Sequence, residues 1–272
     1  MKKTRKMKSG NSPATVIVIW LIMIYLLIPL AACVIYSLFS DWTGVVPHGF
    51  TLSAYAELFR NGAFWSALLE TLLLCIPPIL ITILVVLLAM YAVVVYFPKL
   101  EKYIQIICMI PYTLQGVILS VSILSLYVGS DSILSNRLLM LMGAYCIIIL
   151  PYMYQGIRNS MRAIDMKTLL EAAEMLGYSR LVAFFRVVVP NMMHGIIVSA
   201  LLAVGIIFGD YVLIRNLSGS TVTNVQIYMY QAMKSDSMKS SAVFVMIMLV
   251  TFTIAALVLA GRRREAGAAK RG

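Results

Sequence analysis

The chain has 272 residues, of which 61% are hydrophobic and 12% are charged. A water-soluble domain carries about 45–50% apolar and about 25% charged residues, so the apolar surplus here excludes an ordinary soluble fold and has to face lipid. The net charge of +11 does not indicate a nucleic-acid partner, because the basic residues lie between apolar runs and form no stripe interleaved with aromatic residues.

Long charge-free runs predict six membrane-spanning helices and an all-α integral membrane fold. A spanning helix needs about 20 apolar residues to cross about 30 Å of hydrocarbon. A basic N-terminus over residues 1–13 precedes the membrane domain of residues 14–261, and a basic tail over residues 262–272 follows it. The six runs are Ala14 to Ser40, Thr71 to Pro98, Tyr103 to Ser130, Leu138 to Ile157, Val187 to Gly209 and Ser240 to Gly261.

Prolines inside two of these runs predict bent helices. Pro77 and Pro78 in the second run and Pro111 in the third each lack an amide donor and crowd the preceding turn. Between the fifth and sixth runs, residues 223–233 are apolar enough for a short interfacial or re-entrant helix. At eleven residues this segment is too short to be a seventh span.

The distribution of Lys and Arg predicts the orientation. Alternate loops and the two ends together hold seventeen basic residues, whereas the opposite loops hold only Arg60, Arg137, Arg215, Lys234 and Lys239. Cytoplasmic loops retain basic residues, so we expect both termini and the loop of about residues 158–190 on the cytoplasmic side of the membrane.

The cysteines and histidines predict no metal site and no cofactor. The four cysteines lie in separate apolar runs with no C-x-x-C spacing, and His48 and His194 are isolated. The sequence also lacks a G-x-x-x-x-G-K-[S/T] phosphate loop, an H-E-x-x-H helix and a G-x-S-x-G elbow. We therefore expect no catalytic residue in this chain.

The loop between the fourth and fifth runs contains a predicted amphipathic helix. Asp165 is placed to cap its N-terminus, and Gly177 is placed to end it in a left-handed conformation. Leu169, Leu170, Ala173 and Leu176 recur on one side, with Lys167, Glu171 and Glu174 on the other. Ser179 is placed to cap a second helix that carries Phe184 and Phe185.

Two interpretations of this helix follow from its residues. The small side chains of Ala172 and Ala173 beside carboxylates suit a helix onto which another protein packs closely with charge-assisted hydrogen bonds. An amphipathic helix can instead lie on lipid headgroups, although Glu171 and Glu174 suit an anionic leaflet poorly. The residues alone leave both interpretations open.

The spacing of Glu171-Ala172-Ala173, then Gly177, then Pro190, before the penultimate span, resembles the EAA motif of permease subunits of binding-protein-dependent ABC importers. The segments Gly49 to Arg60 and Ala89 to Ala92 also resemble such permeases, whereas His194 stands where a second proline is frequent. The Phe208 to Val212 segment looks most like permeases of polyamine importers and their iron and phosphonate relatives.

The resemblance implies a pore subunit that performs no chemistry and moves a small solute by alternating access. It implies two cytoplasmic ATP-binding subunits, a second permease that is identical or homologous, an external solute-binding protein and surrounding lipid as partners. The residues implied to dock an ATP-binding subunit are Glu171, Ala172, Ala173, Glu174 and Gly177 of the coupling helix.

The alternatives are a secondary transporter coupled to protons or sodium and a membrane scaffold. A secondary transporter needs ionisable groups near the membrane midplane, and the six runs are charge-free. Candidates along a pathway are Asp210, Gln115 and Glu70. Asp210 is placed either to attract a cationic solute or to make structural hydrogen bonds, and Glu70 suits an interfacial anchor.

Overall fold

The computed structural model describes residues 13–41, 48–114, 116–129, 133–219 and 221–268. The chain forms two compact units. One comprises residues 1–60 and 232–246, and the other comprises residues 61–231 and 247–272. The helices α11 (Val225–Ser235) and α12 (Ser237–Ala268) contribute to both units.

The first unit contains an apolar helix, a hairpin and a short amphipathic helix. They are α1 (Pro13–Tyr36), β1 (Phe39–Asp41), β2 (His48–Phe50) and α2 (Ser53–Arg60). The α1 helix is apolar on all sides, as expected for a helix surrounded by lipid. The strands pair antiparallel with Phe39 opposite Phe50, and α2 buries Ala54 and Leu58.

The second unit is built around three long apolar helices, which are α3 (Gly62–Val95), α6 (Arg137–Arg162) and α9 (Val189–Phe208). The packing of α6 on α3 and α9 is the most extensive in the unit. The segments between α3 and α6 are η1 (Pro98–Leu100), α4 (Glu101–Met109), η2 (Ile110–Thr113), α5 (Gly116–Tyr127) and η3 (Ile133–Ser135).

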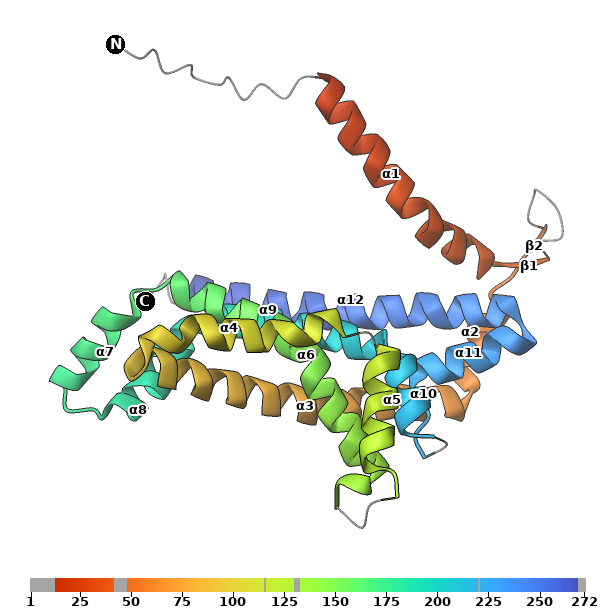
Figure 1. The fold of residues 1–272 in the computed structure, drawn as a ribbon. Coiled ribbons are helices and arrows are strands. Elements are labelled where there is room, and N and C mark those ends of the chain that lie inside the picture. The colour runs from red at the N-terminus through yellow and green to blue at the C-terminus, as the bar shows by residue number, and fades with distance from the viewer. Residues whose placement is uncertain (1–12, 42–47, 115, 130–132, 220, 269–272) are drawn as a thin grey trace. The chain divides into compact units, whose positions relative to one another are not determined.

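The helices α7 (Met166–Met175) and α8 (Arg180–Ala183) connect α6 to α9 and lie at one end of the long helices, here called the α7 end (Figure 1). A π-helix, η4 (Phe184–Val188), leads from α8 into α9. At the opposite end, α10 (Val212–Leu217) packs on α5. The short helix expected over residues 223–233 is observed as α11, two residues further along.

Five helical segments in the described residues are long and apolar enough to span a membrane, and a bent pair makes a sixth. The expectation of an all-α membrane fold is therefore confirmed. The bend predicted at Pro111 in the third run is confirmed, because Pro98–Thr113 and Gly116–Tyr127 meet at 98°. Pro111 sits in the η2 turn at this break, whereas Pro77 and Pro78 lie within the continuous α3 helix.

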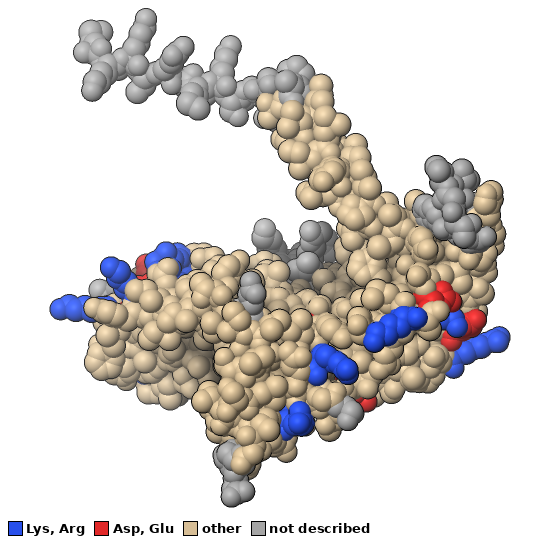
Figure 2. Space-filling model, turned by 45° about the vertical axis from the view of Figure 1, so that its right-hand side comes forward, with Lys and Arg blue, Asp and Glu red and all other residues tan. Residues whose placement is uncertain are grey.

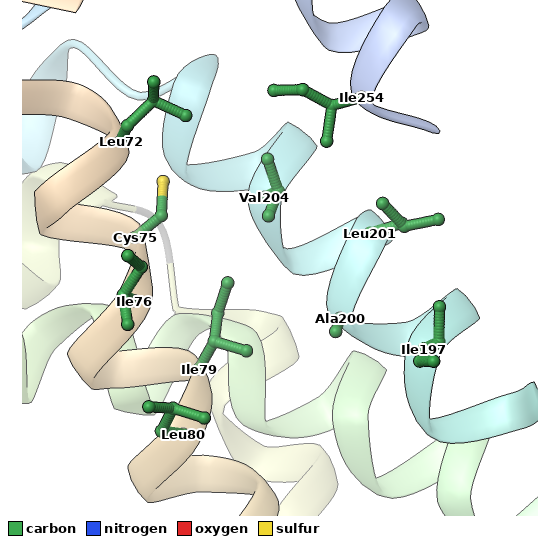
Figure 3. A pocket seen from close by; sticks show the side chains of 10 residues that line it. All are labelled: Leu72, Cys75, Ile76, Ile79, Leu80, Ile197, Ala200, Leu201, Val204 and Ile254. Atoms are coloured by element: carbon green, nitrogen blue, oxygen red, sulfur yellow. The ribbon is translucent and has the colours of Figure 1, made fainter. Parts of the chain in front are cut away.

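Many large hydrophobic side chains of the second unit are exposed. Figure 2 shows charged side chains in small separate groups on an otherwise uncharged surface. An apolar groove of about 460 Å³ runs between α3, α9 and α12 (Figure 3). Its lining has aliphatic side chains such as Ile76, Leu80 and Leu201, with Cys75 as the one sulfur-containing residue. Such a surface suits lipid or another apolar helix.

Candidate functional site

The α7 helix is fixed at both ends by its own sequence. The Asp165 carboxylate accepts hydrogen bonds from the amide of Thr168 at 3.3 Å and from the Thr168 hydroxyl at 2.7 Å. At the other end Gly177 has a φ of 85°, and the Tyr178 amide turns back to donate to the carbonyl of Ala173 at 3.2 Å. This is a Schellman ending, which satisfies carbonyls of the last turn and fixes the direction of the following chain. Both predicted caps are confirmed.

The two sides of α7 differ as predicted, with one correction. Leu170 and Ala173 are buried, and Glu171 and Ala172 on the other side are exposed. Leu176 does not share the buried side, since it is 79% exposed. It is the residue at which the helix ends, and its backbone has already left the helical conformation. Ala173 contacts this chain's own core, so Ala172 is the small residue presented outward.

The buried side of α7 packs on η4 and joins the apolar cluster at the ends of the three long helices. Leu170 and Ala173 belong to the same apolar cluster as Tyr91 of α3, Ile157 of α6 and Phe184 of η4. Phe184 is fully buried, and its ring lies 5.1 Å from the ring of Tyr91, measured between centroids. A force applied to α7 therefore acts on the ends of α3, α6 and α9 through close packing.

Charged side chains surround a cavity of about 430 Å³ beside α7. Glu174 forms an ion pair with Arg180, which follows the turn at Gly177. Of the two predicted docking carboxylates, Glu174 is engaged in this ion pair, and Glu171 lies on the exposed side of α7. Ser179 takes the N-cap position of α8, but its side chain makes no capping hydrogen bond, so that expectation was wrong. The cavity is lined by Val94, Val95, Pro98, Leu170, Glu171, Glu174 and Arg180.

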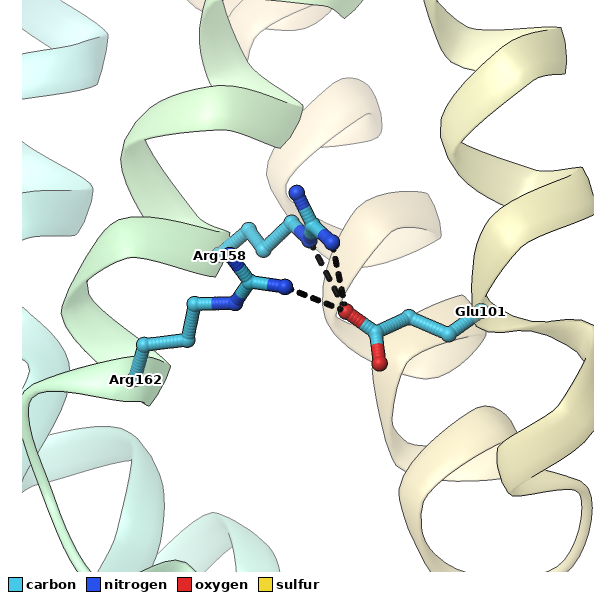
Figure 4. A network of polar contacts seen from close by, with 3 residues as sticks. All are labelled: Glu101, Arg158 and Arg162. Atoms are coloured by element: carbon cyan, nitrogen blue, oxygen red, sulfur yellow. Dashed lines mark hydrogen bonds and ion pairs between the residues drawn. The ribbon is translucent and has the colours of Figure 1, made fainter.

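A second ionic group joins the start of α4 to the end of α6. The Glu101 carboxylate accepts from Nε and Nη2 of Arg158 at 2.9 and 2.7 Å and from Nη2 of Arg162 at 3.2 Å (Figure 4). Arg158 also lies 6.0 Å from the ring centre of Tyr154. The sequence analysis counted the two arginines only as orientation signals. Their spacing of four residues on one helix face was the signal that one acceptor can engage both.

Two glycines allow α6 and α9 to approach unusually closely. A Cβ atom added at Gly156 would stand 1.7 Å from the hydroxyl of Ser199, and one added at Gly195 would stand 1.5 Å from the hydroxyl of Ser160. Each helix therefore presents a glycine and a serine four residues apart to the same pair on the other helix. This crossing was not predicted from the sequence, although a small residue every fourth position is a known signal for close packing in membranes.

Asp210 is engaged within the chain. Its carboxylate accepts from the amides of Leu213 and Ile214 at 3.3 and 3.2 Å and from the hydroxyl of Tyr145 at 3.1 Å. Burial raises the pKa of the Asp210 carboxyl above its ordinary value, while these hydrogen bonds act in the opposite direction. The group caps α10 and joins it to α6, which supports the structural alternative over attraction of a solute.

Glu70 is also used within the chain. It accepts from the amide of Thr223 at 3.0 Å, and the neighbouring Thr71 hydroxyl accepts from the amide of Val225 at 3.0 Å. These bonds fasten the segment before α11 to α3. Gln115, the third pathway candidate, lies outside the described residues. Among the described residues, no group of three or more His, Cys, Asp and Glu side chains is placed to hold a metal ion.

Comparison with known proteins identifies this arrangement. The family described as the binding-protein-dependent transport system inner membrane component matches residues 49–263, which include α7 and both helices on either side of it. The chain belongs to this family. It is a permease subunit of an ABC importer and a multi-pass membrane protein, as the EAA-like spacing implied.

Relatives of this permease point in the same direction. It is 23% identical over 201 residues to the putative 2-aminoethylphosphonate transport system permease protein PhnV of Salmonella paratyphi A, covering 74% of this chain and 75% of that protein. The corresponding proteins of Salmonella typhimurium and Salmonella typhi are equally similar. Of the three solute classes favoured by the sequence, the phosphonate class is the one represented among these relatives.

A solved structure shares the fold of this permease. It is the crystal structure of a bacterial ABC transporter involved in the import of the acidic polysaccharide alginate, and one of its chains superposes with a TM-score of 0.66. The match covers 91% of this chain and 92% of that chain at 18% sequence identity. A permease of this kind works with ATP-binding subunits, a partner permease and a binding protein in general.

Proposed function

We propose that this permease is one of two pore subunits of an ATP-driven importer and that α7 is the helix on which an ATP-binding subunit docks. The observation that carries this proposal is the difference between the exposed and the buried side of α7. Its exposed side offers Glu171 and Ala172, while Leu170 and Ala173 fix the helix to the ends of the long helices.

Docking on α7 couples ATP binding to the pore through rigid contacts. The Asp165 cap and the Gly177 turn hold the helix without help from a partner. When two ATP-binding subunits close on their two permeases, each α7 moves, and the packed ends of α3, α6 and α9 move with it. ATP thus favours one of two pore conformations, which is a population shift between inward-facing and outward-facing states.

The orientation proposed for the chain places α7 and both termini in the cytoplasm. Support comes from the seventeen-to-five bias of basic residues between alternate loops. The solute-binding protein would then meet the opposite face, where α10 and α11 are fastened to α3 and α6 by Asp210 and Glu70. The membrane is the bacterial inner membrane, and the chain itself hydrolyses no ATP.

The solute proposed is a small compound of the phosphonate class. The support is the similarity to permeases named for 2-aminoethylphosphonate, together with the branch of the family that the Phe208 to Val212 segment favours. Polyamines and iron complexes are the other classes in that branch. The described structure offers a polyamine no exposed acidic site among the pathway candidates, since Asp210 and Glu70 are both engaged by the chain's own amides.

Uptake by the complete importer in proteoliposomes tests the proposal. Radiolabelled 2-aminoethylphosphonate and the binding protein are supplied on one side, and ATP on the side of the ATP-binding subunits. We expect accumulation that needs ATP and ignores a proton or sodium gradient. Accumulation driven by an ion gradient without ATP would show a secondary transporter instead. Accumulation of spermidine but not of the phosphonate would leave the ATP-driven mechanism intact and reject the solute class.

A further inference from the structure

A polar groove of about 360 Å³ lies between α6 and α9, on the flank of their close crossing. Hydrogen-bonding side chains from both helices reach it, and its ten lining residues include no Asp, Glu, Lys or Arg. The remaining lining residues are the two crossing glycines and the aliphatic Val198 and Leu202. The hydrogen-bonding residues are Tyr152, Gln155, Asn159, Ser160, His194 and Ser199.

The most exposed of these side chains cannot face lipid. Gln155, Asn159 and His194 are all exposed although they lie within apolar spanning segments. In the part of the chain that the structure describes, neither the Asn159 amide nor the His194 ring has a hydrogen-bonding partner, and the Gln155 amide reaches only the weakly accepting sulfur of Met109. Hydrocarbon offers such groups no partner, so this surface must meet water or another polar surface.

The opposite side of α9 has the opposite character. Ile197, Leu201 and Val204 line the apolar groove with α3 (Figure 3), whereas His194 and Ser199 line the polar one. At about 100° per residue the centres of the two sets lie roughly 120° apart around the helix. One long helix thus presents an entirely apolar side suited to lipid and a polar side that lipid cannot cover, which is the pattern of a helix at the wall of an aqueous pathway.

We propose that the α6–α9 groove is a solute-contacting wall of the pathway in the half next to α7, and that it takes the oxyanion group of a phosphonate-class solute. The proposal rests on the proposed transport function for its solute class. Amide, hydroxyl and imidazole groups donate hydrogen bonds to an oxyanion, and no carboxylate in the lining repels it. Uncharged donors also suit a transport site, since a solute held by fixed cations would leave slowly.

Thiol accessibility in the complete transporter tests the groove. The four native cysteines are replaced, and His194→Cys is compared with Ala200→Cys, which lines the apolar groove about 120° away from His194 around α9. Charged thiol reagents do not enter hydrocarbon, so we expect His194→Cys to react on the order of tenfold faster or more. Asn159→Cys should react like His194→Cys and serves if the histidine variant does not assemble.

Equal rates at positions 194 and 200 would overturn the proposal. So would exclusive cross-linking of His194→Cys to the second permease, which would make the groove a subunit interface. Added 2-aminoethylphosphonate should slow labelling of His194→Cys while spermidine should not, and the reverse result would reject the oxyanion assignment. Labelling requires no ATP, so a failure of ATP-driven uptake would leave these results readable by themselves.

Discussion

The close crossing of α6 and α9 gives the sharpest prediction of stability. Gly195→Ala places a Cβ atom 1.5 Å from the Ser160 hydroxyl, 2.6 Å from its Cβ and 3.2 Å from the carbonyl oxygen of Gly156. Rotating the hydroxyl relieves only the first clash, so the helices must separate. Overpacking of this kind costs about 1–3 kcal/mol.

Gly205→Ala on the same helix is the matched control. No atom lies within 4 Å of a Cβ at Gly205, so this change keeps only the gain in helix propensity, up to about 1 kcal/mol. Both changes gain the same helix propensity, so the two variants should differ by the overpacking cost alone, roughly 1–3 kcal/mol. Ser160→Gly in the Gly195→Ala background removes the clashing side chain and should recover most of the loss, as a coupled pair requires.

The assay is the thermal unfolding midpoint of the purified transporter in detergent, read by size-exclusion chromatography after heating. We expect the order Gly205→Ala at or above wild type, then Gly195→Ala with Ser160→Gly, then Gly195→Ala lowest. Equal midpoints for Gly195→Ala and Gly205→Ala would show that the helices do not approach as closely as described, and the groove beside the crossing would then have a different shape.

Three further predictions concern the ends of the helices. Glu101→Gln should reduce the free energy of unfolding by about 1–3 kcal/mol and so lower the unfolding midpoint, since its partner Arg158 is largely buried. Glu57→Gln removes an exposed ion pair and should cost under about 1 kcal/mol. Equal shifts of the midpoint in the two variants would contradict this. Gly177→Ala should weaken retention of the ATP-binding subunit more than Gly177→Asn, because asparagine adopts left-handed backbone more readily; pull-downs of both variants measure it. Asp210→Asn should keep the unfolding midpoint near wild type, because burial already disfavours the charged form of the Asp210 carboxyl and asparagine retains an oxygen that accepts hydrogen bonds. Asp210→Ala removes that acceptor and should lower the midpoint in the same heating assay.

Hydropathy predicted most of the spanning helices because each is a long apolar run whose signal does not depend on its neighbours. The break in the third span could not be placed in this way. Pro111 marked a weak point in Tyr103 to Ser130, but the 98° bend also depends on packing of α5 against α10, which lies about 90 residues further along the chain.

The caps of α7 were predictable because capping is local. Asp165 and Gly177 act within four residues of their own positions. Burial of Ala173 was also predictable, because it recurs at helical spacing with Leu169 and Leu170, whereas Leu176, placed on the same side, is exposed where the helix ends. The ion pair of Glu174 with Arg180 depends on the reversal of the chain at Gly177.

The polar groove was missed because the sequence analysis followed charge rather than polarity. Tyr152, Gln155 and Asn159 recur at spacings of three and four on α6, which places them on one face. His194 was treated as an isolated residue, since only the crossing of α6 and α9 brings it to the same groove. The sequence alone did not predict contacts between helices that are distant in the chain.

Co-purification of the ATP-binding subunit with variants of α7 tests the central proposal most directly. Ala172 is exposed, so Ala172→Trp leaves this chain's own packing intact and adds bulk only to the proposed docking surface. Ile133→Trp, at a side chain 80% exposed in the loop between α5 and α6, is the control. Overpacking of about 1–3 kcal/mol at the contact predicts roughly 5–150-fold weaker retention for Ala172→Trp. We expect that variant to reach the membrane in normal amount and lose its ATP-binding subunit, while Ile133→Trp keeps it; equal retention by both would contradict docking on α7.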